Sequence, residues 1–135
     1  MSAREGLKRW HAVLAGGSDP SALAAMIAPD AVFHSPVVHT PQRGRPLVTA
    51  YLAAAGQTLG NDSFRYVREL VDGDEALLEF ETELDGIQVN GIDLIRFDED
   101  DMIADFKVMV RPLKAVNKVW EVMAAQLERQ SASRA

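Results

Sequence analysis

Few residues in this chain are suited to acid–base chemistry, and Asp93 is the clearest candidate. It lies in the run IQVNGIDLIRF, where it shares one strand face with Ile95 and Phe97. A carboxyl group among apolar neighbours has its pKa raised by desolvation, so Asp93 is a candidate acid or neutral hydrogen-bond donor. The alternative is a buried carboxylate that is satisfied by backbone N–H groups.

Histidine is the second residue type of interest, because the 135 residues contain three histidines and no cysteine. In LKRWHAVL the apolar positions recur at the spacing of one helical face, which includes Trp10 and His11. His11 is therefore a candidate acid or base at a pocket, with a structural imidazole bonded to a carbonyl as the alternative. His34 and His39 lack an assured third ligand, so we expect no metal, and no cofactor is expected either.

The stretch AVFHSPVVHTPQRG, residues 31–44, ends a β-type run at a serine followed by proline. Phe33 and Ser35 share one side of this run, and His34 points to the other. Ser35 is a candidate ligand-facing hydroxyl. A serine that bonds to the backbone of the turn at a strand end is the alternative.

The periodicity of the apolar residues changes from helical to β-type near residue 63. Helices are predicted over residues 7–14, from Pro20 to about Ile27, over 44–59 and after Pro112. Strands are predicted over 64–70, 75–84, 87–97 and 102–110. Asp19 is the expected N-cap of the second helix, and an Asp-Gly pair between alternating runs indicates a hairpin.

These elements predict an α+β domain over residues 1–130, followed by a frayed tail at 131–135. The sheet is expected to be a curved antiparallel meander, wrapped around the N-terminal helices. The last helix carries an apolar stripe that requires burial, so we expect it to narrow a pocket mouth or complete a dimer interface. The stripe consists of Val116, Val119, Trp120, Met123 and Leu127.

The order of elements, the HSP stretch with its GRP helix entry, and GIDLIRFDEDDMI resemble the nuclear transport factor two-like superfamily. That superfamily includes ketosteroid isomerases and SnoaL-type polyketide cyclases, and the resemblance implies a cone-shaped pocket between helices and sheet. Compared with ketosteroid isomerase, it implies an oxyanion-hole role for Asp93. His11 then stands at the position of the isomerase tyrosine, and Ser35 at that of its aspartate base. A serine hydroxyl cannot remove a proton from carbon near neutral pH, so steroid isomerase activity is not expected.

Aromatic and branched side chains are expected to line the pocket. They are Phe33, Tyr51, Phe64, Tyr66, Phe80, Phe106, Val108 and Val110. The predicted function is to bind a small, mostly apolar ligand, with isomerase- or cyclase-like chemistry at Asp93. The alternative is a non-catalytic binding or dimerisation module with a vestigial cavity.

Charge and surface pattern bear on partners and location. The net charge of −6 and the scattered basic residues argue against nucleic-acid binding. No apolar run approaches the roughly 18 residues of a membrane helix, and MSAREGLKRW is too charged for a signal peptide, so a cytoplasmic protein is expected. Ile92 and Leu94 lie beside glutamates on the outer sheet face, so a homodimer through that face is expected, as the resemblance also implies.

Overall fold

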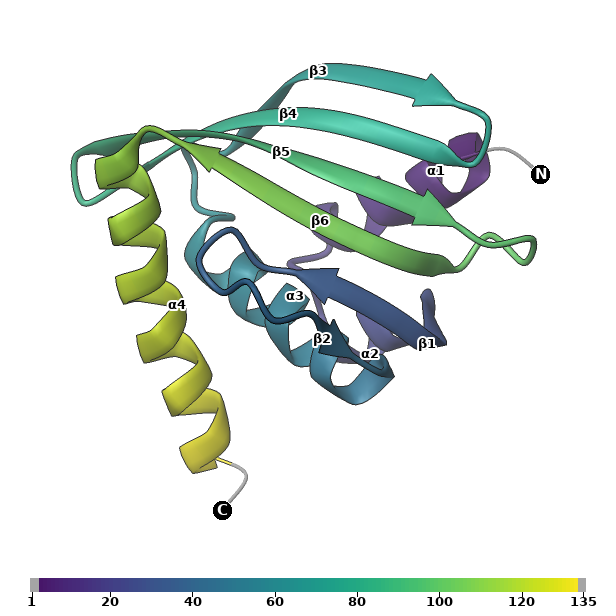
Figure 1. The fold of residues 1–135 in the computed structure, drawn as a ribbon, viewed down its shortest axis with the longest axis horizontal. Coiled ribbons are helices and arrows are strands. Elements are labelled where there is room, and N and C mark those ends of the chain that lie inside the picture. Colours follow the sequence, from purple (N-terminus) through teal and green to yellow (C-terminus); the bar gives the residue numbers. More distant parts are fainter. Residues whose placement is uncertain (1–2, 134–135) are drawn as a thin grey trace.

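The computed structural model describes residues 3–133, which form helices and one curved sheet (Figure 1). The first half contains α1 (Ala3–Ala15), α2 (Pro20–Ala24), β1 (Ile27–His34), β2 (Gln42–Arg43) and α3 (Arg45–Thr58). The second half contains β3 (Arg65–Asp72), β4 (Glu75–Leu84), β5 (Ile87–Phe97), β6 (Ile103–Arg111) and α4 (Leu113–Ser133). The expected α+β fold, with helices on one face of the sheet, is confirmed.

The sheet has the strand order β2-β1-β6-β5-β4-β3, and it is mixed instead of purely antiparallel. Strands β3 to β6 form the expected antiparallel meander. Strand β1 runs parallel to β6. No tight turn joins these two strands, since α3 and four strands lie between them in the sequence, so local turn chemistry does not set their relative direction.

Several element boundaries differ from the sequence-based expectation, including those of α1 and β3, and the differences at α2 and α4 are the most informative. Helix α2 ends at Ala24, because β1 starts at Ile27 and the preceding Met26 carbonyl already accepts a hydrogen bond of 2.8 Å from Ile103 N. Pairing with β6 thus overrides the helical pattern there. Helix α4 continues to Ser133, past the expected domain end at 130, and residues 134–135 of the expected tail lie outside the described residues.

Local signals at two turns are confirmed. Asp19 is the N-cap of α2, where its Oδ2 accepts a hydrogen bond of 3.1 Å from Ala22 N. Asp85 and Gly86 connect β4 to β5 with φ angles of 50° and 82°. Positive φ at both central residues is what a two-residue type I′ hairpin requires, and it fixes the register of the two strands.

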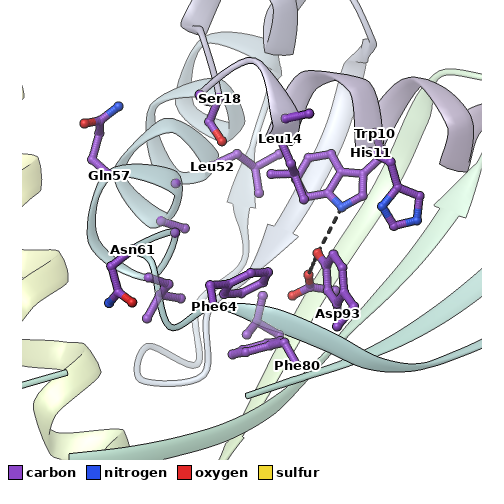
Figure 2. A pocket seen from close by; sticks show the side chains of 18 of the residues that line it. Trp10, His11, Leu14, Ser18, Leu52, Gln57, Asn61, Phe64, Phe80 and Asp93 are labelled. Carbon is purple, nitrogen blue, oxygen red and sulfur yellow. Dashed lines mark hydrogen bonds between the residues drawn. The ribbon is translucent and has the colours of Figure 1, made fainter. Parts of the chain in front are cut away.

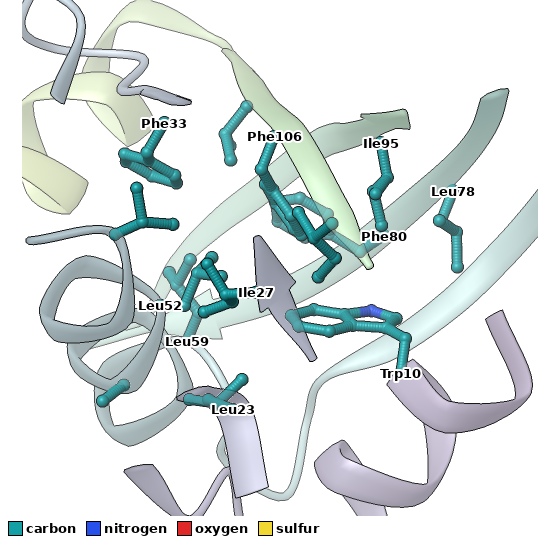
Figure 3. Packing of buried hydrophobic residues seen from close by; sticks show 14 of the residues in the cluster. Trp10, Leu23, Ile27, Phe33, Leu52, Leu59, Leu78, Phe80, Ile95 and Phe106 are labelled. Atoms are coloured by element: carbon teal, nitrogen blue, oxygen red, sulfur yellow. The ribbon is translucent and has the colours of Figure 1, made fainter. Parts of the chain in front are cut away.

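The core lies between the inner sheet face and α1 to α3 (Figure 3). Trp10 packs on Phe106 with ring centroids 5.1 Å apart, and both residues are buried. Gly91 of β5 lies against Phe80, where an added Cβ would come within 2.5 Å of the ring and 2.7 Å of the Met109 carbonyl oxygen. A glycine at this position therefore lets the Phe80 ring lie close to the sheet.

Helix α4 packs on the domain itself, against α3 and the neighbouring strands β5 and β6. Ala115, Val119 and Met123 are buried in that contact, whereas Trp120 is 60% exposed. The rest of the chain therefore leaves Trp120 uncovered, because the buried positions follow the neighbouring helix face, and the burial of Trp120 in a dimer interface stays a prediction. None of the helices in residues 3–133 combines the length and apolar composition needed to cross a membrane.

Candidate functional site

A cavity of about 610 Å³ opens between α1, α3 and the inner sheet face (Figure 2). Pockets that bind small molecules have volumes of roughly 300–1,000 Å³ and are mostly apolar with a few polar groups. Most of the residues expected from the sequence line this cavity. They are His11, Phe33, Phe64, Tyr66, Phe80, Asp93, Phe106 and Val108.

Three expected residues lie outside the cavity lining. Tyr51 packs its ring against Phe33 from α3, with centroids 5.3 Å apart, so it supports the wall from behind. Val110 is half-buried and pairs with Gly91 near the end of β6. Ser35 follows β1, and its Oγ accepts a hydrogen bond of 3.1 Å from Val37 N, which is the turn-bonding alternative for this residue.

Asp93 lies on the inner face of β5 and is 7% exposed. Burial raises its pKa to about 7, against an ordinary value of 3.8, although a hydrogen bond from Tyr66 lowers it. Within residues 3–133 its carboxyl accepts this one hydrogen bond, at Oδ2, and Oδ1 receives none. A carboxyl with so few donors is not well stabilised as an anion, so near neutral pH a large share of Asp93 carries a proton.

Tyr66 connects Asp93 to α1. Its hydroxyl donates to Asp93 Oδ2 at 2.7 Å and accepts from Trp10 Nε1 at 3.0 Å. Burial and the nearby Asp93 carboxylate raise the pKa of Tyr66 above its usual range, so the hydroxyl stays neutral. The result is a directed chain from the indole N–H through the phenol to one carboxyl oxygen, which leaves an acid proton on Oδ1 available for a bound molecule.

This chain of hydrogen bonds could not be predicted from the sequence. Tyr66 was expected to line the pocket, but its partners lie 27 and 56 residues away. The position that corresponds to the isomerase tyrosine was assigned to His11, whereas the residue that bonds to Asp93 comes from β3. The signal in the sequence was limited to an aromatic residue in a β-type run, which is more often plain core.

His11 lies at the cavity with its ring edge-on to Tyr66, the centroids being 5.7 Å apart. Its Nε2 is 2.7 Å from Oε1 of Glu69, and both side chains are 44% exposed. When Nε2–H donates to Glu69, the neutral imidazole keeps its lone pair on Nδ1. Glu69 was not identified from the sequence as a site residue.

The other histidines lie away from this site. His34 Nε2 pairs with Asp105 Oδ1 at 2.9 Å between β1 and β6, and both residues are on the outer sheet face. His39 is exposed. Across the described residues, no cluster of three or more histidine, aspartate or glutamate side chains is arranged to hold a metal ion.

The fold and the cavity define the chain as an α+β pocket domain. A model of the SnoaL-like domain family matches residues 7–106, and the chain belongs to that family. No curated protein matches it.

Solved structures resemble the chain over nearly its whole length. A steroid delta-isomerase from Pseudomonas aeruginosa is 37% identical, with 98% of this chain and 93% of that chain covered and a TM-score of 0.83. An uncharacterized protein with a cystatin-like fold from Silicibacter pomeroyi is 33% identical, with 90% and 84% covered and a TM-score of 0.82. An NTF2-like protein from Mesorhizobium loti, 23% identical with 82% and 91% covered and a TM-score of 0.69, shows the same fold. The expected superfamily is thus confirmed.

Proposed function

We propose that this chain binds a small, mostly apolar carbonyl compound and transfers a proton at the carbon next to the carbonyl group, as isomerases and cyclases do. The observation that carries the proposal is the buried Asp93 carboxyl, which is bonded by Tyr66 at one oxygen and has the other oxygen free within the described residues. A neutral carboxyl at the wall of an apolar cavity is suited to donate a hydrogen bond to a carbonyl oxygen.

The proposed step conserves charge and atoms. His11 Nδ1 removes a proton from the carbon next to the carbonyl, and the electron pair of the C–H bond moves into the C–C bond as the carbonyl oxygen gains negative charge. The proton on Asp93 Oδ1 stabilises that oxygen through a hydrogen bond. His11 then returns the proton to another carbon of the same conjugated system, and Glu69 holds the imidazole in the required tautomer throughout.

Two further observations support an enzyme over a vestigial cavity. The space is not filled by its own aromatic side chains, since about 610 Å³ stays open beside Asp93 and His11. The similar protein from Pseudomonas aeruginosa is named a steroid delta-isomerase, an enzyme of the proposed reaction type. Steroid isomerisation itself is not proposed, because the position that the resemblance assigns to its base is Ser35, whose hydroxyl bonds to Val37 N, and His11 lines the cavity from α1 instead of from that position.

The test is proton exchange at the carbon next to the carbonyl of α-tetralone, a bicyclic apolar ketone, in heavy water by NMR. We expect the protein to accelerate the exchange about a hundredfold over buffer, which is the lower end of general acid–base catalysis. Asp93→Leu should lose both binding and exchange. His11→Gln should bind the ketone and lose the exchange, whereas His39→Gln, which alters an exposed histidine outside the cavity, should behave as the unaltered protein does.

The outcomes separate the two functional classes. Binding that depends on Asp93 without any exchange would identify a non-catalytic binding module and contradict the proposed reaction. If α-tetralone did not bind, or if it bound equally well to Asp93→Leu, the cavity would not be the site and the whole proposal would be wrong.

The proposed partner, besides the ligand, is a second copy of the chain on the outer sheet face. Leu70, Leu77 and Leu94 are directly opposite one another on β3, β4 and β5, and they form an apolar row with Leu70 57% exposed. Ion pairs from Arg65 and Arg68 to the glutamates of β4 lie beside it. We expect a dimer in sedimentation, and a shift to monomer for Leu70→Glu but not for Leu47→Glu, which alters an exposed leucine on α3. A monomeric unaltered protein would refute this interface.

A further inference from the structure

Ser18 is a buried polar residue at the cavity wall that the proposed reaction does not use. It lies in the turn between α1 and α2 and is 4% exposed. Its backbone N–H donates a hydrogen bond of 3.0 Å to the carbonyl oxygen of Val13, in the last turn of α1. The Ser18 hydroxyl lines the cavity and makes no hydrogen bond within residues 3–133. Because the hydroxyl faces the cavity and is not used by another protein group, its hydrogen-bonding capacity is free for a bound molecule.

The side chain of Ser18 packs closely against Gly56 of α3. An added Cβ at Gly56, inside α3, would lie 2.5 Å from both Cβ and Oγ of Ser18. A glycine inside a helix destabilises it by roughly 1 kcal/mol relative to alanine. Helix α3 therefore carries an unfavourable residue at the position where a larger one would clash with Ser18. Ser18 itself has φ of 57°, a left-handed conformation that is uncommon for residues other than glycine.

Ser18 and Asp93 lie at different ends of the cavity (Figure 2). Most of the side chains that line the cavity between them are apolar, although Gln57, Asn61 and Arg65 also contribute to the lining. The apolar ones include Leu14, Leu52, Ala55, Leu59 and Phe64. A molecule that fills this space meets a hydrogen-bond donor at the Asp93 end, apolar side chains along its body, and a serine hydroxyl at the other end.

We infer that Ser18 is a ligand-binding residue that selects apolar carbonyl compounds bearing a second oxygen function, a hydroxyl or a carbonyl, at the end remote from the reacting carbonyl. This inference rests on the proposed function, because Asp93 orients the first oxygen. The serine hydroxyl both donates and accepts, so it suits either kind of oxygen.

The test compares ketones that differ by one remote hydroxyl. The first pair is α-tetralone and its analogue with a hydroxyl on the ring carbon farthest from the ketone, and the longer pair is 4-phenylcyclohexanone and 4-(4-hydroxyphenyl)cyclohexanone. In at least one pair the hydroxyl should lower Kd by about three- to tenfold, the contribution of one hydrogen bond in a buried site. Titration calorimetry gives each Kd.

Ser18→Gly is the variant of choice, because glycine adopts the positive φ of this position readily and removes the hydroxyl. It should abolish the preference for the hydroxylated ketone and leave the Kd of the plain ketone within about twofold. Ser18→Ala should have the same effect on the preference, and Ser21→Ala, which alters an exposed serine on α2, should leave it unchanged.

Failure of this inference is distinguishable from failure of the proposed function. If the plain ketones bind in a manner that depends on Asp93 but neither pair shows a preference, or if the preference survives in Ser18→Gly, Ser18 is not a binding residue and the proposed function is unaffected. If no ketone binds, the proposed function is overturned and this inference with it.

Discussion

The hydroxyl of Tyr66 donates a hydrogen bond of 2.7 Å to Oδ2 of Asp93, across the inner face of the sheet from β3 to β5. The same hydroxyl accepts from Trp10 Nε1 at 3.0 Å, so a helix and two strands meet at one carboxyl group. The chemistry that we propose depends on this contact, because it occupies one carboxyl oxygen and leaves the other for a ligand. Its consequences can be measured without knowledge of the natural substrate.

Protein stability should fall as pH rises toward neutrality because of Asp93. Its pKa is about 7 in the folded chain and 3.8 ordinarily, so the folded state keeps a proton that the unfolded state has released. The contribution of protonated Asp93 to the free energy of unfolding is complete below about pH 4 and is lost as pH rises to about 7. This contribution is on the order of 4 kcal/mol. Asp93→Asn should remove this dependence in urea unfolding followed from about pH 4 to about pH 8. Asp30→Asn, at an exposed position of β1, is the control, and an unchanged slope in Asp93→Asn would contradict the prediction.

Tyr66→Phe should lower the stability of the protein and should also shift the pH midpoint at which that stability falls. The hydrogen bond from Tyr66 lowers the pKa of Asp93, so its loss should raise that pKa above about 7 and move the midpoint of the pH dependence upward. Trp10 Nε1 also loses its acceptor, at a cost of about 1–3 kcal/mol. Tyr51→Phe is the matched control, since the Tyr51 hydroxyl makes no hydrogen bond among residues 3–133. Equal effects of the two variants would show that the hydroxyl of Tyr66 has no special role.

Steroid isomerase activity should be negligible in this protein. The position that the family resemblance assigns to the base is Ser35, whose hydroxyl accepts from Val37 N and lies outside the cavity lining. An absorbance assay with a β,γ-unsaturated ketosteroid should therefore give no turnover above buffer in a preparation that exchanges the α-tetralone protons. Robust isomerisation would show that another residue serves as the base for steroids.

Met123→Ala should destabilise the domain without changing ligand affinity. Met123 is 9% exposed in the contact of α4 with α3, and its Sδ accepts a hydrogen bond of 3.4 Å from Thr58 Oγ1. Truncation of such a buried side chain costs roughly 2–5 kcal/mol, and α4 contributes no lining residue to the cavity. Trp120→Ala, on the exposed side of the same helix, should cost far less, as thermal unfolding would show. A weakened Kd for α-tetralone in Met123→Ala would mean that α4 shapes the cavity after all.

The sequence by itself determined the elements and the direction of several side chains. Helical spacing in α1 placed Trp10 with the core, and alternation along β5 placed Asp93 on the same face as Ile95 and Phe97, which the structure shows to be buried. The Asp85–Gly86 turn determined the β4–β5 hairpin. These features follow from local periodicity and turn geometry, which adjacent residues encode.

The tertiary structure alone decided which residues meet. The parallel pairing of β1 with β6 and the contact between Tyr66 and Asp93 both join segments that are distant in the sequence. The register of β3 is the clearest example. Strict alternation would put Tyr66 and Arg68 on the same face, but a register shift between them pairs Tyr66 with Phe80 and Glu69 with Leu78, two core positions of β4. Tyr66 therefore faces inward toward Asp93, and Glu69 faces inward toward His11. Where a bulge interrupts the alternation, pairing with the neighbouring strand fixes the face on which each side chain lies.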